Sequence, residues 1–74
     1  MNHKDISPKQ WNDLYPIGTH VRYTNSTLGV VIDATTVSVA RYFPGSNYVH
    51  VALNHAPIRS PWVRIDMLEV LEAP

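Results

Sequence analysis

The fold is decided by residues 18–33, which read Gly18-Thr19-His20-Val21-Arg22-Tyr23-Thr24-Asn25-Ser26-Thr27-Leu28-Gly29-Val30-Val31-Ile32-Asp33. Apolar residues alternate with polar ones on both sides of a polar turn at residues 25–27, which is the pattern of a half-buried β-hairpin. A glycine inside the second arm, Gly29, indicates a bulge or a close backbone approach. The alternation predicts an inward face made of Val21, Tyr23, Leu28, Val30 and Ile32.

The same alternation continues after the hairpin. It predicts strands at 36–43 and 48–53, joined by the turn Pro44-Gly45-Ser46-Asn47, and a short strand at 62–65. A single helical or 3₁₀ turn at 66–68 follows, with Asp66 as its N-cap, before the closing residues 69–71. The predicted inward side chains are Val37, Val39, Phe43, Val49, Val51 and Leu53. The predicted outward side chains are Ser38, Ala40, Tyr42, Tyr48, His50 and Ala52.

A short helix precedes the hairpin. Ser7 and Gln10 have the spacing of a capping box, and a proline fills the first helical position between them. Ile6 and Trp11 have the spacing of a hydrophobic staple, and Pro16 ends the helix near residue 15. The expected apolar face consists of Trp11, Leu14 and Tyr15. We expect this face to pack on the chain's own barrel, with docking on another chain as the alternative.

These elements predict a mainly β protein, a five-stranded small barrel with a short N-terminal helix and a one-turn 3₁₀ helix before the last strand. Residues 1–6 are expected to be disordered, residues 7–15 helical, and residues 17–72 to form the barrel. The chain has 74 residues, so there is room for one domain. It contains no cysteine and no apolar run long enough to cross a bilayer. We therefore expect a cytoplasmic protein without a membrane partner.

The net charge is zero but unevenly distributed along the chain. Between residues 18 and 65, four arginines stand against one aspartate, so this part carries +3. The last nine residues hold three acids and no base, so they carry −3. A protein that binds the phosphate backbone of nucleic acids is usually basic overall, and this chain is not.

The order of the elements resembles SH3-like barrels of the KOW type. The residues that carry the resemblance are Gly18 to Tyr23, Gly29-Val30-Val31 and Val63 to Val70. The opening Tyr15-Pro16-Ile17-Gly18-Thr19 is in addition similar to small proteins encoded by prophages and mobile elements. The resemblance implies a fold rather than an activity, because SH3-like barrels carry many unrelated functions.

One enzyme family on this scaffold is the plasmid-borne type II dihydrofolate reductase, a tetramer with a central pore. Its pore strand reads Val-Gln-Ile-Tyr, and alignment on the final Leu-Glu places Ser60-Pro61-Trp62-Val63 there. Pro61 then stands where the family's glutamine should be, and Val63 where its tyrosine should be. We therefore expect no reductase activity and keep an oligomeric pore enzyme only as a remote alternative.

No other motif for catalysis, a cofactor or a metal is present. The four histidines lie at 3, 20, 50 and 55, without the spacing of a zinc site. His20 and His50, both outward on neighbouring strands, are open to two interpretations: a weak metal or proton-sensitive pair, or solvated imidazoles. No hydroxyl or carboxylate is accompanied by the partners that nucleophilic or acid–base catalysis requires. We expect a protein that is not an enzyme and needs no cofactor.

Aromatic and basic residues form the candidate interaction surface, in which Tyr42 and Tyr48 are expected to be cross-strand neighbours on the outward face. The alternative interpretation is that Tyr42 and Tyr48 form a stabilising pair and that Trp62 belongs to the core. Its members are Arg22, Arg41, Tyr42, Tyr48, His50, Trp62 and Arg64. The first hypothesis is a non-catalytic protein–protein interaction module that self-associates, because the core is small and strand edges are left over. The alternative is a nucleic-acid-binding accessory protein that stacks bases on the tyrosines with support from the arginines.

Overall fold

The computed structural model describes residues 6–56 and 59–73, and within them the chain is mainly β. The predicted disordered segment at 1–6 lies outside the described residues except for Ile6, which packs against the core. The elements, in chain order, are α1 (Pro8–Leu14), β1 (His20–Asn25), β2 (Val30–Thr35), β3 (Arg41–Tyr42), β4 (Val49–Ala52), β5 (Trp62–Arg64), the 3₁₀ helix η1 (Ile65–Met67) and β6 (Leu68–Glu72).

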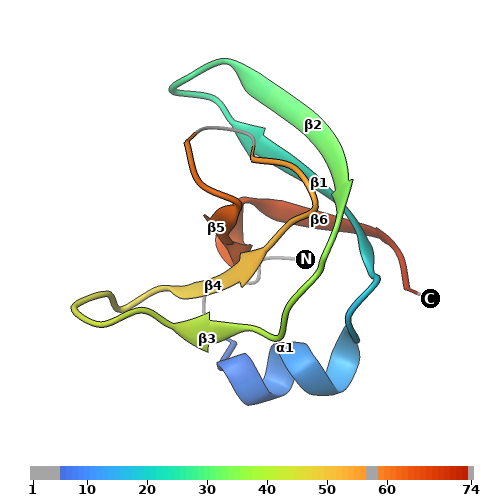
Figure 1. The fold of residues 1–74 in the computed structure, drawn as a ribbon, viewed down its shortest axis with the longest axis vertical. Coiled ribbons are helices and arrows are strands. Elements are labelled where there is room, and N and C mark those ends of the chain that lie inside the picture. Colours follow the sequence, from blue (N-terminus) through green and yellow to red (C-terminus); the bar gives the residue numbers. More distant parts are fainter. Residues whose placement is uncertain (1–5, 57–58, 74) are drawn as a thin grey trace.

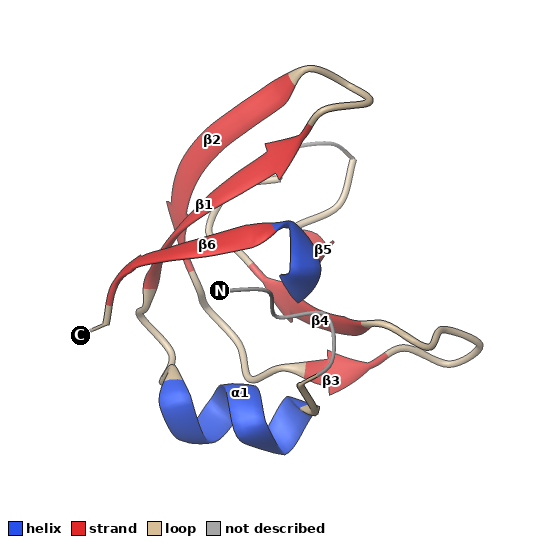
Figure 2. Cartoon of the chain, turned by 180° about the vertical axis from the view of Figure 1, so that it is seen from behind, coloured by secondary structure: helices blue, strands red, loops and turns tan. Residues whose placement is uncertain are grey.

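The strands form two small antiparallel sheets with the orders β2-β1-β6 and β3-β4-β5 (Figure 1). The helix α1 lies across the end of the molecule near β3 (Figure 2). The described residues thus form six strands in two sheets and no closed barrel, so the expected five-stranded small barrel, closed or partly closed, is not confirmed. The predicted 3₁₀ turn before the last strand is confirmed.

The two sheets are joined at a corner formed by Thr35 and Thr36. On one side, the Thr36 N–H donates to the Thr19 carbonyl (3.0 Å), which continues the β1–β2 ladder. On the other side, the Asn54 N–H donates to the Thr35 carbonyl (2.9 Å) and the Thr35 N–H donates to Asn54 Oδ1 (3.0 Å). Thr36 also bridges to Leu53 at the end of β4. The corner is therefore tied by hydrogen bonds to both sheets, and residues 37–40 lead from it to β3.

The predicted strand at 36–43 shrinks to Arg41–Tyr42, and its inward face was assigned wrongly. Val37 and Val39 are exposed (52% and 55%), whereas Thr36 and Ala40 are buried. Thr36 points inward because its Oγ1 accepts the N–H groups of Gly18 and Thr19, each at 3.2 Å. The even-numbered inward positions of β2 therefore continue past the corner, where the sequence analysis restarted the alternation on the valines.

Burial elsewhere largely follows the prediction. Val21, Tyr23, Val49, Val51 and Leu53 are buried, with Ile65, Leu68 and Val63 around them. Leu28 was expected on the inward face but is 58% exposed in the hairpin turn. Gly29 also lies in this turn with a φ of +68°, and a Cβ there would meet nothing within 4 Å, so the turn conformation and not a close approach accounts for the glycine. Ala52, expected to face outward, is buried opposite Trp62 in the β4–β5 ladder.

The helix has the predicted capping box. The Gln10 N–H donates to Ser7 Oγ (3.1 Å), and the Ser7 N–H donates to the Gln10 side chain (2.7 Å). Trp11 is the buried residue of this helix, at 1% exposure, whereas Leu14, expected beside it, is 55% exposed. Asn12 fixes the docking, because its side-chain amide exchanges two hydrogen bonds with the backbone of Ala40 (2.7 and 3.2 Å). Packing of the helix on its own chain is thereby confirmed.

The 3₁₀ helix η1 begins at Ile65, and Arg64 occupies its N-cap without a side-chain hydrogen bond. Asp66 is therefore not the N-cap that was predicted; its carboxylate pairs with Arg64 instead. In the described part of the chain, no helix has the length and apolar character needed to cross a membrane.

Candidate aromatic–basic binding face

One face of the β3-β4-β5 sheet gathers aromatic and basic side chains. The strand registers place Arg41 opposite His50 and His50 opposite Arg64, which gives a row across all three strands. Side chains two positions away along a strand share the same face. The set, here named the aromatic–basic face, consists of Arg41, Phe43, Tyr48, His50, Trp62 and Arg64.

Four of these side chains form one contact cluster. The rings of Phe43 and His50 are stacked, with centroids 4.4 Å apart and planes 2° from parallel. Trp62 meets Phe43 edge-on at 5.1 Å. The guanidinium of Arg41 lies 5.7 Å from the Phe43 ring centre and 5.9 Å from that of Trp62. Within residues 6–56 and 59–73, Arg41 forms no ion pair, so its charge remains available to a ligand.

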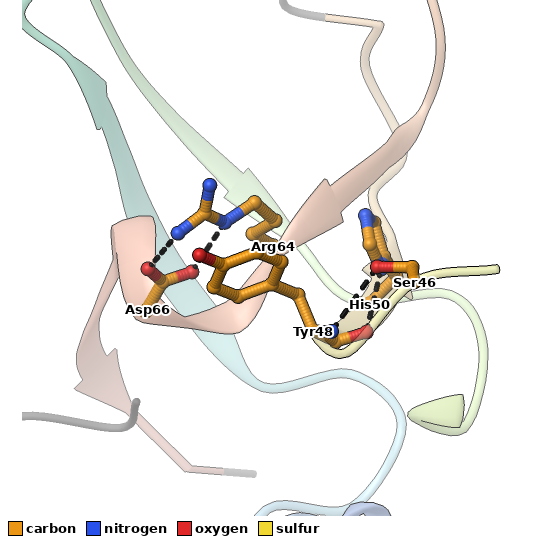
Figure 3. Close-up of polar contacts among 5 residues, drawn as sticks. All are labelled: Ser46, Tyr48, His50, Arg64 and Asp66. Atoms are coloured by element: carbon orange, nitrogen blue, oxygen red, sulfur yellow. Dashed lines mark hydrogen bonds and ion pairs between the residues drawn. The ribbon is translucent and has the colours of Figure 1, made fainter. Parts of the chain in front are cut away.

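Arg64 has a different environment (Figure 3). Its guanidinium lies 3.5 Å from the ring centre of Tyr48 and forms two hydrogen bonds with the Asp66 carboxylate (2.9 and 2.5 Å). The hydrogen bond that Arg64 donates to the Asp66 carboxylate raises the pKa of Arg64 above its ordinary value. Arg64 is thus held by an internal acid and positions the ring of Tyr48, which stays 40% exposed.

Two hydrogen bonds fix the backbone of the connection between β3 and β4. The Tyr48 N–H donates to Ser46 Oγ (3.1 Å), and His50 Nδ1 donates to the Tyr48 carbonyl (3.0 Å), as drawn in Figure 3. Because a carbonyl only accepts, the contact between His50 and Tyr48 is a hydrogen bond when Nδ1 carries a proton. The Nε2 atom is the ring nitrogen outside this contact.

A hollow of about 180 Å³ adjoins the aromatic–basic face. Its lining combines residues of that face with residues from the end of β1 and from η1: Tyr23, Asn25, His50, Trp62, Val63, Arg64 and Met67. This volume is below the range of pockets that enclose drug-sized ligands.

Charge is divided between the two sheets. The strands β3–β5 and η1 carry two arginines and one aspartate, a net charge of +1 with neutral histidine. The strands β1, β2 and β6 carry Arg22 against Asp33, Glu69 and Glu72, a net charge of −2. An anionic ligand is therefore attracted to the second sheet in preference to the first.

The structure brings together five of the seven residues named from the sequence: Arg41, Tyr48, His50, Trp62 and Arg64. Arg22 lies on the other sheet, where it forms an ion pair with Asp33 (2.8 Å), and its hydrogen bond lowers the pKa of Asp33. Tyr42 is opposite Val49 in the ladder, so it is not the cross-strand neighbour of Tyr48 that was expected.

Phe43 belongs to the face but was missed, because the sequence analysis assigned it to the core. Because Thr36 points inward, the alternation places even-numbered residues of this stretch inward and odd-numbered residues outward. Phe43 is therefore outward, as Arg41 is. The signal was therefore present in the continuation of the β2 alternation through the corner.

The histidines do not form the pair that was considered. His20 lies on β1 and His50 on β4, in different sheets. Among the residues with described positions, no three histidine, aspartate or glutamate side chains are grouped closely enough to hold a metal ion. Comparison of this chain with models of protein families, with curated proteins and with solved structures finds no significant match.

Proposed function

We propose that this protein is a non-catalytic binding module whose ligand is single-stranded nucleic acid, bound on the aromatic–basic face. The observation that carries the proposal is Arg41, a cation that pairs with no acid among the described residues and lies over the rings of Phe43 and Trp62. Aromatic rings for stacking beside a free cation for the phosphates are the recurring elements of single-strand recognition. The fold proposed with this function is an SH3-like barrel that is open along one side.

The arrangement favours unpaired bases over a duplex. A duplex hides the flat surfaces of its bases, and its recognition relies on helices, ribbons or arms that enter a groove. This face instead offers partly exposed rings on a short sheet, with a hollow beside Trp62 and His50. Splayed bases can use both features, since every base has a π-face.

A second candidate is the protein–protein interaction module that the sequence favoured. Tyrosine, tryptophan and arginine are also the residues that dominate protein interfaces. The specific observation for this candidate lies on the other sheet, at the exposed edge of β2, which the next subsection treats. The two candidates use different surfaces, so their tests are independent.

The proposed function is tested by replacing Arg41→Ala and measuring the fluorescence anisotropy of a labelled oligonucleotide of about 12 nucleotides. Loss of one phosphate contact is expected to flatten the plot of log affinity against log salt by about 0.7 for a single strand. The affinity of the Arg41→Ala variant for the oligonucleotide at low salt is expected to fall as well, because the same phosphate contact is lost.

Arg22→Ala is the matched control, because it removes the same charge from the other sheet. It is expected to leave both the affinity and the salt slope close to those of the unmodified protein. Equal losses for the two variants, or no binding by the unmodified protein at low salt, would contradict the proposal.

A further inference from the structure

The strand β2 presents an open edge. At its end, the Thr36 N–H and carbonyl both bond toward β1, through Thr19 and Gly18. Backbone groups alternate in direction along a strand, so those of Thr35, Asp33 and Val31 point away from β1. The described residues place β2 at the margin of its sheet, with β1 as its partner.

Among the residues that the structure describes, one position of this edge is covered by the chain itself. Asn54 occupies both backbone groups of Thr35, with a carbonyl acceptor at 2.9 Å and an N–H donor at 3.0 Å. Beyond that point, a hollow of about 340 Å³ separates the edge from the loop after β4, and Ile32, Asp33, His55 and Ala56 line it. Four backbone groups, those of Val31 and Asp33, thus remain on the edge without a described partner.

The edge also lacks the usual protection against pairing. Natural edge strands carry lysine, proline or a bulge that blocks a neighbour. The strand Val30–Thr35 contains neither lysine nor proline, and its register with β1 runs without a bulge. Val31 is 61% exposed, and the charge of Asp33, the acid of this strand, is compensated by Arg22.

We propose that this edge binds a second copy of the same chain, strand β2 against strand β2 in antiparallel orientation, with the two-fold axis at Ile32. In this register, Val31 of each copy pairs with Asp33 of the other copy. The resulting hydrogen bonds satisfy all four backbone groups that are unpartnered on each strand. It also brings the two half-buried Ile32 side chains together where each hollow has room.

Antiparallel registers with the two-fold axis moved by one residue are less favourable. An axis at Asp33 sets two carboxylates directly opposite each other and requires the backbone groups of Thr35, which Asn54 already holds. A two-fold axis at Val31 would require Gly29 to pair with Asp33 of the other copy. The φ of Gly29, +68°, lies outside the strand region. Because a two-fold arrangement uses the same edge on both copies, the assembly closes at the dimer.

The test is sedimentation equilibrium on the full chain, from micromolar concentrations to about 1 mM, the range of a weak interface. Val31→Pro removes the outward N–H, at a position where an edge strand tolerates proline, and is expected to weaken dimerisation at least tenfold. Val31→Thr keeps the N–H and the β-branched shape, and it is expected to dimerise like the unmodified protein. Monomer throughout, assemblies beyond the dimer, or unweakened dimers of Val31→Pro would overturn the proposal.

Amide hydrogen exchange on the unmodified protein provides a second readout that does not depend on the folding of a variant. Between dilute and concentrated samples, the amides of Val31 and Asp33 are expected to become protected. The Val70 amide, on the opposite edge strand β6, serves as the internal reference and is expected to stay unchanged. Exchange at Val31 and Asp33 that does not depend on concentration would refute the β2 interface, while leaving the nucleic-acid proposal untouched.

Discussion

Replacing Trp11→Ala is expected to destabilise the protein by about 3–5 kcal/mol, the usual cost of truncating a buried tryptophan. Trp11 is 1% exposed and is the buried anchor of α1, while Tyr15 contacts its ring with centroids 4.6 Å apart. A chain of 74 residues has a small core, so a loss of this size removes much of its total stability. Urea unfolding followed by circular dichroism measures the change.

Leu14→Ala is the matched control on the same helix. Leu14 is 55% exposed, and surface substitutions of this kind usually change stability by less than about 0.5 kcal/mol. If Trp11→Ala proves too unstable to analyse, Trp11→Phe retains part of the ring and is expected to fall between the two. A Trp11→Ala protein as stable as Leu14→Ala would show that the helix does not contribute to the core.

The second large effect concerns binding. Trp62→Ala is expected to weaken the affinity for single-stranded oligonucleotide by about 5- to 150-fold, the equivalent of one stacked base at 1–3 kcal/mol. Trp62 lines the hollow beside the face, and its ring also holds Phe43 in place. Fluorescence anisotropy at fixed salt gives the affinities, and thermal unfolding verifies that the variant is folded.

Tyr42→Ala is the control for this substitution. Tyr42 is an aromatic side chain of β3 in the same sheet and is 51% exposed, but it is directed to the other side of the ladder from Arg41. It is therefore expected to bind the oligonucleotide as the unmodified protein does. Losses of equal size in the two variants would point to general destabilisation instead of stacking.

Local signals predicted much of the fold. The Ser7 capping box and the alternation through Val21, Tyr23, Val49 and Val51 are short-range patterns, and each is confirmed. The strand after the hairpin was predicted less well, because a buried threonine took the place that a valine was expected to occupy. Thr36 continues the inward phase of β2, and its buried hydroxyl is satisfied by N–H donors of Gly18 and Thr19, which lie far away in the sequence.

The candidate site depended on that same long-range detail. His50 was placed on an outward position by alternation, whereas the alternation predicted for residues 36–43 put the odd-numbered positions, and with them that of Arg41, inward. The register that aligns Arg41, His50 and Arg64 in one row comes from tertiary pairing. Arg22 could not be separated from them by sequence, since its sheet and its ion pair with Asp33 depend on the fold. Phe43 was assigned to the core because its aromatic ring suits a core as well as a binding face.

The most direct measurement is the change in backbone amide chemical shifts when a single-stranded oligonucleotide is added to the labelled protein. The account predicts that shifts concentrate on the aromatic–basic face, at Arg41, Phe43, Tyr48, His50, Trp62 and Arg64, and that Arg22 and the rest of the β2-β1-β6 sheet stay in place. Shifts centred on the β2-β1-β6 sheet, or none at low salt, would contradict it.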